Sequence, residues 1–140
     1  MLNCWIVPCN VKYFDVVTHF KQHKTVIWKN ISSVRPKDTV YIYLGAPYKE
    51  LRYKCVVLND NVGTDVLLNN NYAMPQRPIS SLYQVEIKYM ELELVDEYPS
   101  GTFVFPDLRN NGLGQVQVQA RTSKHLQEYI DAKCEALGRS

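Results

Sequence analysis

Short apolar segments alternate with polar stretches along the whole chain. Asn3–Val7 is an apolar run ended by Pro8, which predicts a short buried strand. In the next segment the apolar side chains recur every three or four positions, as on one face of a helix: Tyr13, Val16, Val17 and Phe20. We therefore expect a helix from about Val11 to His23, with Asn10 as its N-cap.

The apolar and aromatic residues in the middle of the chain predict four strands of a sheet. These strands are Thr25–Trp28, Val40–Leu44, Leu51–Leu58 and Tyr83–Val95. Loop chemistry separates the first two at Lys29–Asp38, and a long polar loop covers Asn59–Ser81. In the last strand the apolar positions change parity, which predicts a β-bulge near Met90–Glu91.

The C-terminal part contains two helices and one short strand. Pro106–Asn110 is a short helix that Gly112 ends, and Val116–Gln119 alternates as a strand does. Thr122 or Ser123 caps a final helix. No crossover helix separates the middle strands, so the element order favours an α+β fold with a small, curved, barrel-like sheet. At 140 residues we expect a single domain over 1–140.

Composition narrows the protein class. No run of eighteen apolar residues occurs, so we expect no membrane contact through a spanning helix. We see no export signal in the sequence, and four cysteines in such a chain are typical of reduced thiols. We therefore expect a cytoplasmic protein.

The distribution of charge is uneven, although the net charge is only +2. Residues 1–59 carry nine Lys and Arg against three acids, a net charge of +6, whereas residues 60–140 carry seven against eleven, a net charge of −4. This asymmetry favours an anionic partner for the basic part.

Two chemical alternatives start from the cysteines. Cys4-x4-Cys9 followed by His19-x3-His23 has the residue types of a zinc finger, but nine residues between Cys9 and His19 are too few for one. We expect no metal and no cofactor. Cys9 with His19 or His23 also offers the residue types of a small thiol hydrolase, although nothing in the spacing requires that geometry.

Aromatic residues next to cations indicate a different function. Trp28 ends a strand and is followed directly by Lys29 and Asn30. An aromatic wall with amides on its rim and cations outside suits a nucleobase, which stacks on the ring while its phosphates contact the cations. Burial in the core is an equally good explanation of Trp28, and the better one for Trp5.

Several motifs in the first sixty residues together resemble an EVE domain, of the PUA-like superfamily and related to YTH domains. These motifs are Asn3–Asn10, Phe14-Asp15, Val26–Asn30, Lys37–Tyr48 and Leu51–Val57. Two segments depart from the family pattern. After the first strand this chain has Val-Pro-Cys-Asn at Val7–Asn10, where many relatives have a segment like Lys-Ser/Thr-Glu-Pro. Lys37 takes the place of the glycine in a Gly-Asp turn.

The resemblance implies a pseudo-barrel of about six mostly antiparallel strands flanked by helices. It also implies a nucleic-acid-binding module that reads a modified or methylated base of DNA or RNA, in association with a separate nuclease or modification system. The base pocket would be formed by Trp28, Pro8, Cys9, Asn10, Asn30, Tyr43, Pro47 and Tyr48. The phosphate contacts that we expect are Lys24, Lys29, Arg52 and Arg121. An enzyme using Cys9, or a protein-interaction module using the Asn59–Ser81 loop, are the alternatives.

Overall fold

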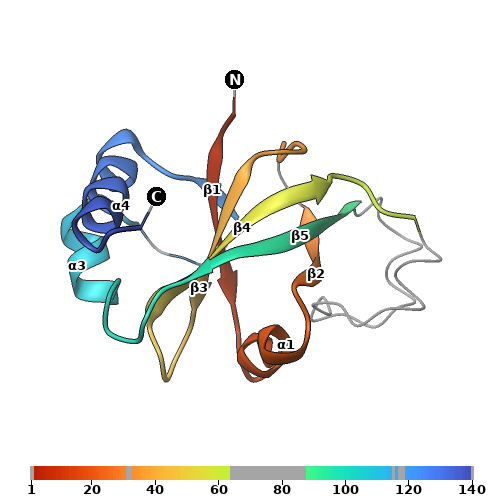
Figure 1. Cartoon of the computed structure of the whole chain (residues 1–140), viewed down its shortest axis with the longest axis horizontal. Coiled ribbons are helices and arrows are strands. Elements are labelled where there is room, and N and C mark those ends of the chain that lie inside the picture. The colour runs from red at the N-terminus through yellow and green to blue at the C-terminus, as the bar shows by residue number, and fades with distance from the viewer. Residues whose placement is uncertain (1, 31–32, 64–87, 115, 117–118, 140) are drawn as a thin grey trace.

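Six strands form one curled sheet flanked by helices (Figure 1). The computed structural model describes residues 2–30, 33–63, 88–114, 116 and 119–139. In chain order the elements are β1 Cys4–Cys9, α1 Val16–Gln22, β2 Thr25–Asn30, β3 Thr39–Leu44, β4 Glu50–Asn59, β5 Lys88–Glu97, α3 Phe105–Asn110, β6 Ala120–Arg121 and α4 Lys124–Ala136. None of the helices among these residues is long and apolar enough to cross a membrane.

The sheet has the strand order β2-β5-β4-β3-β1-β6. Among the strands of the described residues, the β1–β3 pair is parallel and the other four pairs are antiparallel. The predicted α+β class, with six mostly antiparallel strands flanked by helices, is confirmed.

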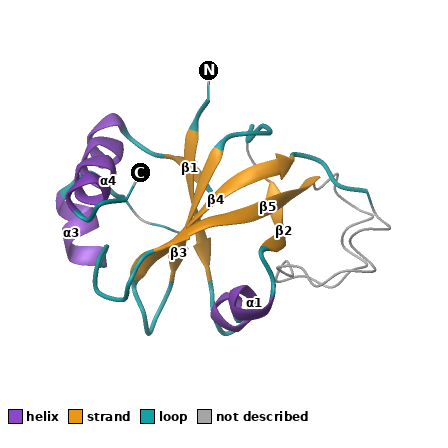
Figure 2. Cartoon of the chain, viewed as in Figure 1, coloured by secondary structure: helices purple, strands orange, loops and turns teal. Residues whose placement is uncertain are grey.

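Each face of the sheet has its own hydrophobic core because side chains alternate along a strand. Val40, Ile42 and Leu44 of β3 point into the concave face, where α1 covers them. Tyr41 and Tyr43 point to the opposite face, where they pack with residues of α3 and α4. Figure 2 shows α3 and α4 together on one side of the sheet and α1 apart from them.

Extra residues in β4 and β5 curl the sheet. Leu58 is unpaired in β4 where Val57 pairs with Leu92 and Asn59 with Glu91. The register therefore shifts next to the predicted position, but the extra residue lies on β4. The extra residue of β5 itself is Val95, between pairs formed by Leu94 and Asp96. Such bulges increase the local twist of a strand.

Capping side chains move the start of the first helix and decide between the two caps expected for the last one. The first helix begins at Val16, five residues later than expected, because the Asp15 carboxylate accepts the Thr18 backbone N–H at 3.1 Å. Asn10 instead accepts the Lys12 N–H at 3.0 Å in a turn that precedes the helix. At the other end of the chain, Ser123 rather than Thr122 caps α4.

The last predicted strand is displaced along the sequence. β6 is Ala120–Arg121, whereas Val116–Gln119 was the expected range. Residues 117–118 of that range lie outside the described residues. Most of the Asn59–Ser81 loop and the start of the Tyr83–Val95 strand also lie outside them.

Candidate functional site

The two outermost strands of the sheet, β2 and β6, approach each other at one place. Gln119 donates a hydrogen bond from its side-chain amide to the Lys29 carbonyl at 3.4 Å. Two residues later Arg121 pairs with Trp5 of β1. Two residues of extended chain reach at most about 7 Å, so the ends of the sheet lie close together here. We call this region, formed by Lys29, Asn30, Gln119 and Arg121, the seam.

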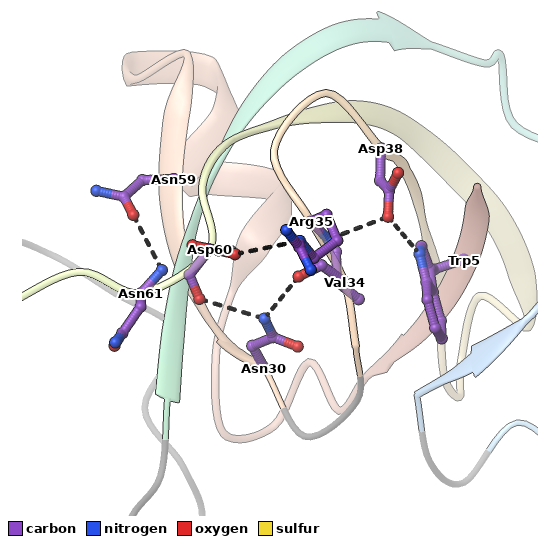
Figure 3. A network of polar contacts seen from close by, with 8 residues as sticks. All are labelled: Trp5, Asn30, Val34, Arg35, Asp38, Asn59, Asp60 and Asn61. Atoms are coloured by element: carbon purple, nitrogen blue, oxygen red, sulfur yellow. Dashed lines mark hydrogen bonds and ion pairs between the residues drawn. The ribbon is translucent and has the colours of Figure 1, made fainter. Parts of the chain in front are cut away.

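A polar network fixes the chain beside the seam (Figure 3). The Asp38 carboxylate, in a residue only 1% exposed, accepts hydrogen bonds from Asn3 N, Trp5 Nε1 and Arg35 N, each at 3.0 Å. Burial raises the pKa of Asp38, but these hydrogen bonds outweigh burial and hold the pKa below its usual value. Asp38 therefore remains charged and ties the N-terminal strand to the loop before β3.

Asn30 extends this network to β4. Its side-chain amide donates to the Val34 carbonyl at 3.2 Å and to the Asp60 carbonyl at 3.3 Å. The residue is 6% exposed, so these bonds satisfy an amide that has little access to water. Asn30 thus joins the end of β2 to the loop before β3 and to the segment that follows β4.

Exposed cations surround the network. The Arg121 guanidinium donates to Asn3 Oδ1 at 2.7 Å and lies 5.9 Å from the centre of the Trp5 ring. Arg35 exposes 76% of its side chain, and its Nε lies 3.9 Å from an Asp60 carboxylate oxygen, which leaves the pair weak. Lys37 is exposed as well. Because the nearby Asp38 is buried, the solvent-facing charge of this region is mainly positive.

Trp28 lies in the concave core. The residue is 7% exposed, and its ring meets the ring of Phe14 edge-on with 6.0 Å between centres. Cys9 belongs to the same core. A base would reach the face of this indole only after a neighbouring side chain moved, so stacking on Trp28 stays a prediction.

The other residues of the predicted pocket do not converge on Trp28. Tyr43 is buried on the opposite face of the sheet, because its neighbours Ile42 and Leu44 take the concave positions. Asn10 follows the carboxyl end of β1, while Asn30 lies beside the loop that enters β3, so the two amides lie at opposite ends of β3.

Pro8, Pro47 and Tyr48 lie at the end of the sheet that also holds Asn10. Pro8 pairs with Tyr43 near the end of β3, and Pro47 and Tyr48 form the exposed turn that follows it. The structure therefore does not bring all these residues together in one pocket. The structure joins Trp28 with Cys9 in the core and Asn30 with the seam.

The predicted phosphate contacts also separate. Lys29 and Arg121 lie at the seam. Lys24 is exposed but precedes β2, at the end of that strand opposite Asn30. Arg52 is 9% exposed and donates to Glu50 Oε2 from Nε at 2.8 Å and from Nη2 at 2.5 Å. A guanidinium neutralised in this way is a poor phosphate ligand, so the geometry does not favour the predicted role of Arg52.

The chemistry of Cys9 does not favour a nucleophile. Burial, followed by the charge of Asp15, raises the pKa of this thiol to about 12. The His19 ring is occupied by the Thr25 carbonyl, 2.7 Å from Nε2. Within the described ranges, no three His, Cys, Asp or Glu side chains gather as metal ligands. Cys4 and Cys9 pack on opposite faces of β1, which explains why the zinc-finger pattern does not converge.

Sequence reasoning missed four residues of this site. Gln119 is ninety positions from its partner Lys29, and no local pattern reveals such a contact. Arg35, Lys37 and Asp38 were interpreted as loop residues and as part of a family motif. A carboxylate directly before a buried strand was the one signal that pointed to Asp38.

The architecture matches solved structures of very different sequence. ASCH from Zymomonas mobilis has a TM-score of 0.60 at 11% identity, with 93% of this chain and 94% of that one covered. Human THYN1, solved in complex with DNA containing 5-methylcytosine, gives 0.62 at 9%, with 94% and 97% covered. A hypothetical protein from Leishmania major gives 0.62 at 16%, with 99% and 98% covered.

The chain has a PUA-like fold. No protein-family model matches the sequence, and no curated protein matches it either. At such low identities the likeness shows the PUA-like fold alone. The comparisons do not reach beyond this fold, so the resemblance to EVE domains in particular stays a prediction.

Proposed function

We propose that this chain is a nucleic-acid-binding module that contacts its ligand at the seam. The observation that carries the proposal is the set of cations near the polar network, with exposed Arg121 and half-buried Lys29 at the seam and exposed Arg35 and Lys37 on the loop before β3. Accessible cations attract the phosphates of an oligonucleotide. THYN1, a DNA complex with the same PUA-like fold, supports the proposal.

We place the base contact next to two amides that are already hydrogen-bonded within the protein. Gln119 and Asn30 are 8% and 6% exposed, respectively, and both hold the strand ends at this place. We propose further that the base is modified, as in the 5-methylcytosine DNA bound to THYN1, and that it stacks on Trp28 once a neighbour such as the half-buried Phe14 moves.

A salt titration tests the phosphate contacts. Arg121→Gln removes one cation from the seam, and Lys24→Gln removes another exposed cation at the far end of β2, about 17 Å from Lys29 along that strand. We expect Arg121→Gln to weaken binding and to reduce the slope of log K against log salt by about 1. Equal effects of the two variants, or binding that does not depend on salt, would contradict the seam as the contact surface.

Tryptophan fluorescence tests the base contact, because the chain has only two tryptophans. Trp5→Phe leaves Trp28 as the reporter, and Trp28→Phe leaves Trp5. A methylated oligonucleotide should quench the first variant more than the second, and more than its unmethylated counterpart does. If Trp28 is not quenched while binding persists, the indole does not stack the base.

A further inference from the structure

Tyr48 presents a supported aromatic face outside the seam. The residue is 40% exposed in the turn between β3 and β4, and the Arg52 guanidinium carbon lies 4.9 Å from the centre of its ring. One face of the ring is thus covered by a cation, while much of the residue remains open to solvent. Such a ring is oriented before any ligand arrives.

The cation behind the ring is itself fixed. Glu50, 3% exposed, receives two hydrogen bonds from Arg52 on Oε2 and one from Gly101 N on Oε1, at 2.9 Å. Burial lowers the pKa of Arg52, but the hydrogen bond and charge of Glu50 outweigh burial and leave the pKa above its usual value. Arg52 is therefore always charged, held in one orientation, and matched by one buried carboxylate.

The backbone of the turn is anchored on both sides. Tyr48 N donates to the Gly45 carbonyl at 3.1 Å, and Phe105 N donates to the Lys49 carbonyl at 2.9 Å. Lys49, the next residue along the chain, is exposed to solvent. An oriented aromatic ring followed in the chain by an exposed lysine has the chemistry that receives an unpaired nucleobase and its phosphate.

We propose that Tyr48 is a second contact point, where an unpaired base of a single-stranded segment stacks, with Arg52 as its positioning residue and Lys49 as a phosphate contact. This inference rests on the proposed function and names single-stranded nucleic acid as its ligand. The seam lies near the start of β3 and Tyr48 follows its end, so the two points are at least about 17 Å apart along the strand. With about 3.4 Å per stacked nucleotide, a strand needs about five nucleotide steps to span them.

A length series of single-stranded oligonucleotides tests the proposal, with three-nucleotide and twelve-nucleotide probes as its extremes. Tyr48→Ala should weaken binding of the longer probe by about 5- to 150-fold and leave the shorter probe unchanged. Tyr48→Phe keeps the ring and should stay within about twofold of wild type. Tyr13→Ala is the matched control, because Tyr13 is 64% exposed and lies in a turn at the same end of the sheet.

A double-mutant cycle tests the positioning by Arg52. Arg52→Lys keeps the charge but loses the planar fork that holds Glu50 and covers the ring. It should weaken binding of the long probe in the wild-type chain and have no effect in the Tyr48→Ala background. A purely structural loss would weaken binding equally in both backgrounds and would overturn the positioning by Arg52.

The outcomes separate this proposal from the proposed function. If the long probe binds wild type and Tyr48→Ala equally, the Tyr48 contact is wrong while binding at the seam stands. If Tyr48→Ala weakens the three-nucleotide probe as much as the long one, Tyr48 is not a separate contact point. If no oligonucleotide binds wild type, both proposals fall.

Discussion

The most demanding prediction concerns the carboxylate of Asp38. Asp38→Ala removes the common acceptor of three N–H groups that come from Asn3, Trp5 and Arg35. The three groups differ in what replaces the lost bond. Arg35 is exposed and Asn3 is half-buried, so water can reach their backbone N–H groups, whereas Trp5 is 6% exposed.

The expected loss of stability follows from these exposures. A buried indole N–H left without an acceptor costs about 1–3 kcal/mol, and each of the two accessible bonds contributes about 0.5–1.5 kcal/mol. Asp38→Ala should therefore lower the free energy of unfolding by about 2–6 kcal/mol, a large share of the roughly 5–15 kcal/mol that a domain has. Asp38→Asn keeps an acceptor oxygen and should lose less.

Urea unfolding with a double-mutant cycle measures the decisive bond. Trp5→Phe removes the indole N–H and keeps an aromatic ring, and Trp28 remains as the fluorescent probe. We expect the two changes to be coupled by about 1–2 kcal/mol, since each removes one partner of the same bond. Strictly additive effects, or an Asp38→Ala variant within about 0.5 kcal/mol of wild type, would refute the inference that Asp38 organises this end of the sheet.

Three further predictions follow from single residues. Lys37 has a φ of 74°, a conformation that glycine adopts more easily than lysine, so Lys37→Gly should raise the free energy of unfolding by up to about 1 kcal/mol. Lys24 has no positive φ, so Lys24→Gly should lower that free energy. The same response at both positions would contradict this interpretation. Cys9 has a pKa of about 12, so it should stay unmodified by a thiol reagent at pH 8, whereas the half-buried Cys4 should react first. Fast labelling of Cys9 in the folded protein would instead favour the thiol-enzyme alternative. The pKa of Asp38 is lower in the folded protein than in the unfolded chain, so the ionised carboxylate stabilises the fold. This contribution is complete above the unfolded pKa of about 4 and is lost as the pH falls through the folded pKa. Urea titrations at pH 3 and pH 6 should therefore show that acid destabilises wild type more than Asp38→Asn.

The strands were predictable because their patterns are local. The alternation in Val40–Leu44 predicted the two faces of β3, and the structure places Val40 and Tyr41 on opposite faces accordingly. The sequence did not show which of these faces would carry Trp28. That depends on pairing between β2 and β5, which are separated by more than fifty residues.

The candidate site was predicted only in part, because charge in a sequence does not reveal its partners. Lys29 and Arg121, both predicted to contact phosphates, lie at the seam. Arg52, predicted for the same role, is instead held by Glu50 and lies against the Tyr48 ring. Arg52 is also the extra residue of β4 where Ile42 pairs with Tyr53 and Tyr43 with Leu51. A bulge changes the direction of a side chain, so simple alternation along β4 misplaces it.

The sequence by itself determined the elements, the split of apolar residues between two faces, and the excess of positive charge in the first part of the chain, because these properties depend on near neighbours. Only the tertiary structure decided which cations remain free and where the two ends of the sheet meet. Those outcomes depend on contacts such as Gln119 with Lys29 and Arg121 with Asn3, which join residues about a hundred positions apart. Long-range pairing of this kind is set by the closure of the whole sheet, and no short segment of the chain encodes it.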